Sequence, residues 1–264
     1  MTTQKIIYLL VGLVLGFVVG FAFANNVNRR EQDTLRAELT RQHSGTPTGG
    51  TTSAPAAGAS RTGSTDNDEI PTLTEEQLRN AVAKADASPG DAALQRLSGQ
   101  GLYLYAMKTG NTFILSDAAR ILKRAHEADP KDYQITALVG NALFLVGREK
   151  GDSAPLREAR GYYQQALQLK PDDVVVRTSL GLTHFYDKPS DPQKAIAEYR
   201  KSLVIDPRHE ATLQNLVTAL VAVGNLPEAE KRLGELEKIN ESNAELPNLR
   251  AQLQQKKNAA KENR

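Results

Sequence analysis

The stretches AARILKRAHEADP (residues 118–130), ARGYYQQALQLKP (159–171) and AIAEYRKSLVIDP (195–207) repeat one arrangement of residue types. Each begins with alanine, has a bulky residue four positions later and a small residue three positions after that, and ends in proline. Two residue types keep the same spacing of 41 residues: Pro89, Pro130 and Pro171, and Gly99, Gly140 and Gly181. A period shared by two residue types indicates an internal repeat.

The repeated region is predicted to be entirely helical. From Pro71 onward apolar residues recur at helical spacing, and no alternating run is long enough for a strand. The period defines four units, each predicted as helix, turn, helix: residues 92–132, 133–173, 174–209 and 210–243.

Polar residues stand where the helices of each unit are predicted to begin. Before the first helices, a side chain can accept hydrogen bonds from the unpaired amides of the first turn; the residues there are Asp91, Asp132, Asp173 and His209. The second helices are predicted to start at Ser116 or Asp117, around Ser153 to Pro155, at Asp191-Pro192 and at Asn225.

Small residues are predicted to determine how the helices pack, because antiparallel helices approach closely only where side chains are small. One small residue in each helix supplies the contact, a second one lets the next unit pack, and proline ends the second helix because it lacks an amide hydrogen. The predicted packing residues are Gly99, Ala118, Ala125 and Pro130; Gly140, Ala159, Ala166 and Pro171; Gly181, Ala195 and Pro207; and Ala229.

This arrangement resembles the tetratricopeptide repeat (TPR) family over about residues 74–243. The resemblance implies an all-α fold, an α-solenoid of helix-turn-helix repeats. The first two units differ from the family pattern because they have 41 residues where the family has about 34. The seven extra residues lie between the helices of a unit and predict either longer helices or a projecting loop.

The ends of the solenoid are predicted to be covered by single helices, because end units lack a neighbour on one face. Residues 71–91 hold an N-terminal capping helix, opened by the capping box Thr74-Glu75-Glu76-Gln77. Residues 244–264 hold a C-terminal capping helix and tail, with Leu246, Leu249 and Leu253 on one side. We therefore expect ten helices in this domain.

The N-terminal part carries a predicted membrane anchor. After a short flank at residues 1–5, residues 6–24 are uncharged and apolar, and a helix of this length spans about 28 Å, close to the bilayer's hydrocarbon thickness. We expect one transmembrane helix in contact with the lipid bilayer. The alternative is a signal peptide cleaved after Ala24, because Ala22-Phe23-Ala24 has the small-x-small form.

Two segments link this anchor to the repeats. Residues 25–42 are predicted as a juxtamembrane helix, and residues 43–70, rich in Gly, Ser, Thr and Pro, as a disordered linker with an r.m.s. span of about 30 Å. Basic residues flank both sides of the anchor, so the sequence leaves its orientation open. The expected location is the bacterial inner (plasma) membrane, single-pass, with the soluble domain on the periplasmic or extracytoplasmic side.

The resemblance implies that the first helices line a concave groove in which a protein or peptide partner binds. Aromatic rings beside amides suit an extended chain, because rings supply contact area and amides pair with peptide backbone. The alternative is that these rings pack between neighbouring helices. The predicted groove residues are Arg96, Gln100, Tyr103, Asn141, Phe144, Thr178, Phe185, Gln214 and Thr218.

Several other classes of function are not indicated. The net charge is +2, so no strong field for nucleic acid is present, and without cysteine there is no disulfide or thiolate metal site. His43, His126, His184 and His209 have no metal-ligand spacing, and His184, with Asp187 one turn away, is expected to be partly buried and hydrogen-bonded. No phosphate loop, nucleophile motif or cofactor motif appears, so we expect neither an enzyme nor a cofactor.

The sequence thus predicts a membrane-tethered TPR scaffold that binds a partner protein. Its plan is similar to that of the anchored TPR subunit of bacterial cytochrome c maturation, which implies an apoprotein chaperone as one alternative. A self-associating structural component of an envelope complex, hence a homo-oligomer, is another. The sequence does not identify the partner.

Overall fold

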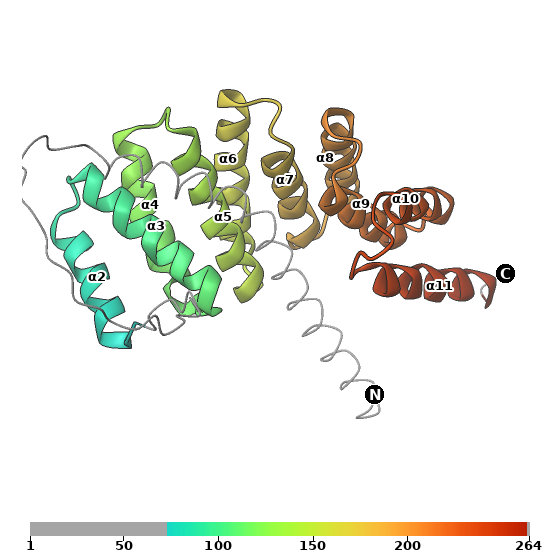
Figure 1. The fold of residues 1–264 in the computed structure, drawn as a ribbon, viewed down its shortest axis with the longest axis horizontal. Helices are drawn as coiled ribbons and strands as arrows, with labels where there is room; N and C mark the ends of the chain where they lie inside the picture. Colours follow the sequence, from blue (N-terminus) through green and yellow to red (C-terminus); the bar gives the residue numbers. More distant parts are fainter. Residues whose placement is uncertain (1–72, 263–264) are drawn as a thin grey trace, which may run out of the picture. The chain divides into compact units, whose positions relative to one another are not determined.

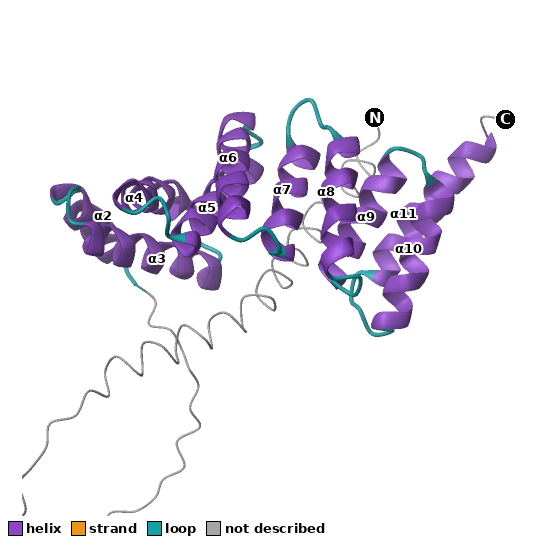
Figure 2. Ribbon diagram, turned by 90° about the horizontal axis from the view of Figure 1, so that it is seen from above, coloured by secondary structure: helices purple, strands orange, loops and turns teal. Residues whose placement is uncertain are grey.

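The repeat region is an α-solenoid. The structure is a computed structural model that describes residues 73–262, and the predicted membrane span, juxtamembrane helix and linker lie outside the described residues. Within residues 73–262 there are ten α-helices, one 3-10 helix and no strand (Figures 1 and 2). The elements are α2 (Glu75–Ala87), α3 (Ala92–Thr109), η1 (Thr112–Ile114), α4 (Leu115–Ala128), α5 (Tyr133–Lys150), α6 (Ser153–Leu169), α7 (Val174–Tyr186), α8 (Pro192–Ile205), α9 (Glu210–Ala222), α10 (Leu226–Ile239) and α11 (Leu246–Glu262).

The four predicted units correspond to the helix pairs α3/α4, α5/α6, α7/α8 and α9/α10. Each pair packs internally, and each second helix packs on the first helix of the next unit. In Figure 1 the pairs follow one another along the long axis in chain order. The core is correspondingly elongated, with one cluster from Leu78 to Leu180 and another from Ala195 to Leu253, and Leu182 packs against both. No helix of the described region is long and apolar enough to cross a bilayer.

A glycine facing a bulky side chain joins the two helices of each of the first three units. A Cβ placed on Gly99 would lie 2.7 Å from Leu122 Cγ, and one placed on Gly181 would lie 2.5 Å from Tyr199 Cε1. Gly140 faces Tyr163 at 2.8 Å in the same way. Separations this short leave no room for a methyl group, so any side chain at these glycines would push the helices apart.

The alanines of the second helices are fully buried at the same contacts. Ala118, Ala159, Ala195 and Ala229 have no exposed surface. The second small residues, Ala125, Ala166 and Ser202, are also buried. The prolines after the second helices, Pro130, Pro171 and Pro207, lie exposed in the turns. The glycine of the first helix therefore contacts the bulky residue that lies one turn after the alanine in the second helix. The small side chain of the alanine allows the two helix backbones to approach closely.

The helix starts agree with the sequence for the first helices of three units. The carboxylates of Asp91, Asp132 and Asp173 accept hydrogen bonds from the backbone amides of Leu94, Ile135 and Val176 at 2.8 to 3.0 Å. Such a cap stabilises a helix by about 1 kcal/mol. His209 holds the equivalent position before α9 as predicted, but its side chain makes no capping hydrogen bond, and its Nδ1 atom pairs with the Thr212 hydroxyl.

Two of the second helices begin as predicted. Helix α8 has Asp191 as cap and Pro192 in its first turn, and α10 begins directly after Asn225, with Pro227 in its first turn. Helix α4 begins at Leu115, continuous with η1, and Ser116 and Asp117 lie inside its first turn. Helix α6 is capped by Asp152 rather than by a residue from Ser153 to Pro155. Asn225 precedes α10 without a side-chain cap.

The extra residues of the first two units lengthen the first helices. Helices α3 and α5 have 18 residues each, whereas α7 and α9 have 13. In unit two the turn is reduced to Gly151 and Asp152, with Gly151 in the left-handed conformation that favours glycine. In unit one η1 takes up part of the insertion.

Helix α2 is attached to unit one by polar bonds in addition to the apolar packing of Leu78 and Ala85. The predicted capping box of Thr74 and Gln77 opens it. The buried Gln95 side chain donates to the carbonyls of Ala85 and Ser88 at 2.7 and 2.9 Å. The Asp86 carboxylate pairs with Arg120 and Arg124, and these two guanidinium groups lower its pKa to about 2.

At the other end, α11 packs against α9 and α10. The leucines predicted to face the solenoid, Leu246, Leu249 and Leu253, are buried. Ion pairs between Lys257 and Glu230 and between Arg250 and Glu237 border this apolar contact. Both ends of the solenoid are thus closed by a single helix, but by different means.

We predict that Gly181→Ala lowers the free energy of unfolding by about 1 to 3 kcal/mol, because the buried Tyr199 ring leaves no space for a methyl group. The matched control is Gly161→Ala in the interior of α6, where nothing lies within 4 Å of the added Cβ. This control should stabilise the protein by about 0.5 to 1 kcal/mol, since alanine favours the helix. Denaturant unfolding followed by circular dichroism measures both, and equal effects would refute the packing role of Gly181.

Candidate protein-binding surface

The solvent-facing side of the first helices α3, α5, α7 and α9, called here the first-helix wall, is nearly uncharged. These four helices contain 7 charged residues, whereas the second helices α4, α6, α8 and α10, of similar total length, contain 19. The middle turns of α5 and α9 contain none. Water therefore meets ionic side chains mainly on the second helices.

The charges of the first helices lie within five residues of a helix end, and Arg96 and Arg177 are paired. The Arg96 guanidinium pairs with Asp132, the residue that caps α5. Arg177 contacts Glu198 at 3.4 Å and donates to the Pro171 carbonyl at 2.8 Å. The first ion pair joins α3 to the cap of α5, and the second joins the two helices of unit three, α7 and α8.

Three of the predicted groove residues are buried. Tyr103 and Phe144 have 6% and 7% of their surface exposed and belong to the hydrophobic core. Thr178 is buried at the interface of units three and four, where its hydroxyl lies 2.6 Å from that of Thr212. The expectation that these side chains face a groove is corrected: they pack between neighbouring helices.

The other predicted groove residues keep some accessible surface. Gln100, Asn141, Phe185, Gln214 and Thr218 are half-buried. Asn141 Oδ1 accepts a hydrogen bond from the Tyr163 hydroxyl at 2.9 Å, which orients its amide. Gln214 donates to Asn243 at 2.9 Å and Thr218 to the Gln214 carbonyl at 3.1 Å. These residues leave part of their polar surface for a ligand.

Several accessible apolar residues of the wall were missed by the sequence prediction. Some lie one residue after a predicted aromatic position (Leu104, Leu145 and Tyr186), and the others lie six residues before one (Leu97 and Leu138). Leu97 is 70%, Leu104 37% and Tyr186 42% exposed. One residue corresponds to 100° around a helix, so this shift separates the buried side from the accessible one. The seven-residue spacing of the paired leucines in α3 and α5 was the available signal.

Aromatic rings from units two and three gather at one point of the wall. The exposed Tyr186 ring lies edge-on to Phe144 and Phe185, with centroids 6.0 and 5.5 Å away. The Arg148 guanidinium lies 5.6 Å from the centre of the Phe144 ring. Tyrosine and arginine beside a packed aromatic cluster are typical of the residues that dominate protein interfaces.

The three histidines of residues 73–262 do not belong to a metal-binding cluster. His126 Nδ1 lies 3.1 Å from the Thr136 hydroxyl, and His209 Nδ1 lies 2.6 Å from that of Thr212. His184 is half-buried as predicted, but Asp187 pairs with Arg160 at 2.9 Å instead of with it. No group of three metal-binding side chains occurs in the described part of the chain.

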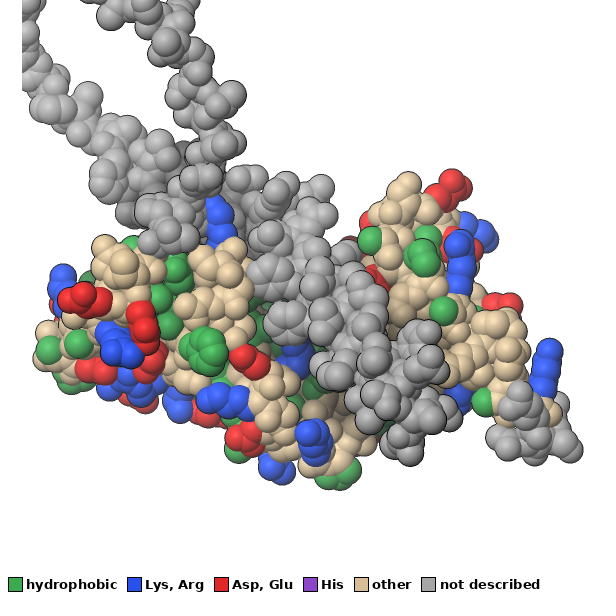
Figure 3. Space-filling model, turned by 90° about the horizontal axis from the view of Figure 1, so that it is seen from below, with side chains coloured by type: hydrophobic (Ala, Val, Ile, Leu, Met, Phe, Trp, Pro, Cys, Tyr) green, Lys and Arg blue, Asp and Glu red, His purple; other side chains and the backbone are tan. Residues whose placement is uncertain are grey.

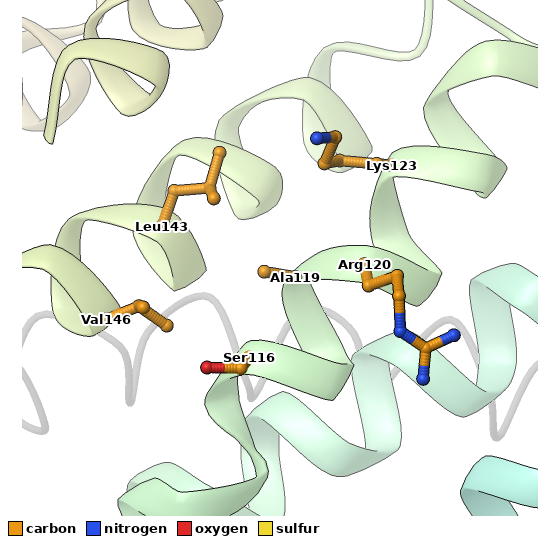
Figure 4. A pocket seen from close by; sticks show the side chains of 6 residues that line it. All are labelled: Ser116, Ala119, Arg120, Lys123, Leu143 and Val146. Atoms are coloured by element: carbon orange, nitrogen blue, oxygen red, sulfur yellow. The ribbon is translucent and has the colours of Figure 1, made fainter. Parts of the chain in front are cut away.

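A shallow pocket of about 280 Å³ between α4 and α5 does not have the chemistry of an anion site. Ala119, Leu143 and Val146 form its apolar side, with Ser116, Arg120 and Lys123 beside them (Figure 4). Arg120 pairs with Asp86 and Asp117, and Lys123 with Glu158. Carboxylates of this chain thus already neutralise its cations.

Charged side chains of both signs are interspersed on the surface. Figure 3 shows this mixture over the face it presents, without a broad area of a single sign among the described residues. Most of these charges form surface ion pairs such as Arg200 with Glu228 and Lys201 with Glu198. This pattern does not favour binding to a polyanion.

Comparison with known proteins confirms the resemblance suggested by the sequence. Residues 189–253 match a family model described as tetratricopeptide repeat. The solved structure of MamA is 22% identical over 64% of this chain and 90% of its own, with a TM-score of 0.50. YrrB, described as a TPR protein with an unusual peptide-binding site, is 16% identical over 67% of this chain and 84% of its own, with a TM-score of 0.52.

At these identities the solved structures show a shared fold and no more. No curated protein sequence matches the chain significantly. The described region therefore has the TPR fold, and its function has to be argued from its own surface.

We predict that stability falls on acidification from about pH 7.5 to about pH 5.5 because of two histidines. Burial lowers the pKa of His184 and His209 below their ordinary value of 6.5. As the pH falls through this value and below it, the two histidines therefore become protonated in the unfolded chain before they do so in the folded chain, and this difference favours unfolding. The contribution of the two neutral histidines to the free energy of unfolding is fully present above their pKa in the unfolded chain.

The control is the double variant His184→Leu and His209→Asn, in which leucine matches Leu102, Leu143 and Leu220 at the equivalent positions. Urea unfolding at both pH values should show a smaller loss for this variant than for the native chain. Equal losses would show that other groups cause the pH dependence.

Proposed function

We propose that this protein is a membrane-tethered scaffold that binds a segment of a partner protein on its first-helix wall. The observation that carries the proposal is the segregation of charge: the wall is neutral and exposes leucines and Tyr186, while ionic side chains cover the second helices. Exposed apolar surface bordered by polar residues is typical of interaction sites. The proposal is for a binding protein, and no chemical step is assigned to it.

The wall offers two kinds of contact to a bound segment. The leucines and the exposed edge of Tyr186 can bury apolar side chains of the partner, at about 25 cal/mol per Å² of area removed from water. Gln100 and the oriented amide of Asn141 can pair with its backbone. The helices that carry these groups pack against other helices of the solenoid, so little ordering is required when the partner binds.

The comparisons agree with this proposal at the level of the fold. YrrB, which shares the TPR fold, is described as having a peptide-binding site. The membrane tether rests on the uncharged apolar residues 6–24, followed by a Gly-, Ser-, Thr- and Pro-rich linker. A linker of this composition would let the scaffold search for partners near the membrane surface.

We predict that Tyr186→Ala weakens partner binding by about tenfold while changing stability little, because the ring is 42% exposed and central to the wall. A photo-crosslinking amino acid placed at residue 186 in the full chain should form an adduct with a partner segment in native membranes. The matched control is residue 204 on α8, where Val204 is 82% exposed outside the wall.

The adducts distinguish the alternatives when their masses and sequences are read. Adducts at residue 186 that are absent at residue 204 support the proposal. A sole product of twice the monomer mass would favour self-association over a separate partner. Equal labelling at both positions would contradict a specific role for the wall.

We predict that the full chain stays with membranes after alkaline carbonate extraction and that deletion of residues 6–24 releases it. The apolar segment is long enough to span the bilayer, and the rest of the chain has no comparable run. A reporter enzyme fused after Arg264 would establish the side of the membrane, and we expect the extracytoplasmic side. Release of the intact chain by carbonate would refute the anchor.

A further inference from the structure

Helix α3 exposes a continuous apolar stripe at the N-terminal end of the solenoid. Leu97, Gly101 and Leu104 lie on one side of the helix, at spacings of four and three residues. Leu97 is 70% and Leu104 37% exposed, and nothing lies within 4 Å of a Cβ placed on Gly101. Ala93, also exposed, extends the stripe by one turn, and Lys108 ends it.

The stripe is open because no first helix precedes α2 within the described residues. In the next unit the same positions are covered: Ala142, equivalent to Gly101, is fully buried, and Leu138 and Leu145 are half-buried. Helix α5 is in contact there with α3, the first helix of the preceding unit. Helix α2 acts as a second helix without a first, so α3 lacks the neighbour that α5 has.

The open side of α3 has the form of a receptor for a helix. Leu97, Gln100, Gly101 and Leu104 stand at positions i, i+3, i+4 and i+7, the four corners of the hole that receives a side chain in helix packing. Glycine at one corner makes this hole deeper than alanine would. A leucine-sized side chain from an adjacent helix therefore fits between Leu97 and Leu104.

The charges on α3 indicate the polarity of such a helix. The helix has two charged residues and no acidic one. Arg96 is paired with Asp132, whereas Lys108 is exposed and forms no ion pair with any residue between 73 and 262. The centre of the stripe therefore presents no charge to a bound partner, and the end of the stripe presents one free cation, Lys108.

We propose that this stripe is a docking site, which binds an amphipathic helix of a partner protein with an uncharged leucine-type stripe that ends in a carboxylate. The carboxylate pairs with Lys108, and the central apolar residue occupies the hole at Gly101. The docked helix takes the place of the missing first helix beside α2. The stripe is the α3 part of the first-helix wall, because Leu97, Gln100 and Leu104 belong to both, and it lies on another helix than Tyr186. The proposal therefore rests on the function proposed for the wall and names the class of partner that its α3 part binds.

The test measures binding of two designed helical peptides to the full chain in lipid nanodiscs, by fluorescence anisotropy, with empty nanodiscs as the blank. Both peptides carry the same leucine stripe, and one ends it with two glutamates, the other with two lysines. We expect the acidic peptide to bind about tenfold more tightly than the basic one, and Lys108→Glu to reverse this order. Gly101→Leu, which fills the hole without a clash, should abolish binding of both peptides.

The control variant Val204→Ala, on α8 outside the wall, should leave peptide binding unchanged, and crosslinking at residue 186 tests the Tyr186 region of the wall separately. Circular dichroism verifies that each variant is folded. The proposal is overturned if neither peptide binds, if the acidic and basic peptides bind the native chain equally and also bind Lys108→Glu equally, or if Val204→Ala removes binding. It is also overturned if Leu97→Cys, in a chain that otherwise has no cysteine, crosslinks to a second copy or to residues 1–72 of its own chain.

Discussion

The contact between a glycine of the first helix and a bulky side chain of the second is the constraint on which the described structure depends. Gly140 lies against the fully buried Tyr163 ring, and Gly99 and Gly181 face Leu122 and Tyr199 in the same way. Because the ring occupies the space of a missing side chain, the two helices have one close packing distance. The fourth unit has Val217 in place of glycine and Leu233 in place of tyrosine, so a smaller partner compensates for a larger one.

This contact also determines which side of each first helix faces solvent. Once the glycine side is directed at the second helix, and its neighbours at the adjacent units, only a narrow arc of α3, α5, α7 and α9 remains accessible. That arc carries leucines, amides and Tyr186, while the second helices carry most charges. The surface available for binding is therefore a consequence of the packing code rather than a separate feature added to it.

The sequence predicted the fold well because its signals are local and repeated. Proline and glycine periods located the four units, and Asp91, Asp132 and Asp173 located three helix starts. The accessible residues were predicted less well, because a shift of one residue turns a side chain by 100° around the helix. A column of aromatic rings is compatible with both the buried side and the solvent-facing side. Whether the inserted residues lengthen helices also stayed open, since a segment such as REKGDS around Gly151 can extend a helix or leave it.

The open stripe on α3 could not be predicted from the sequence for a different reason. It is exposed because no first helix precedes α2 within the described residues. Helix α2 is fixed by directional bonds: Gln95 reaches the carbonyls at its C-terminal end, and Asp86 pairs with Arg120 and Arg124. Apolar packing alone is non-directional, and a more apolar α2 would gain by covering Leu97 and Gly101. The polar attachment holds α2 in the position of a second helix, and the apolar side of α3 consequently stays accessible.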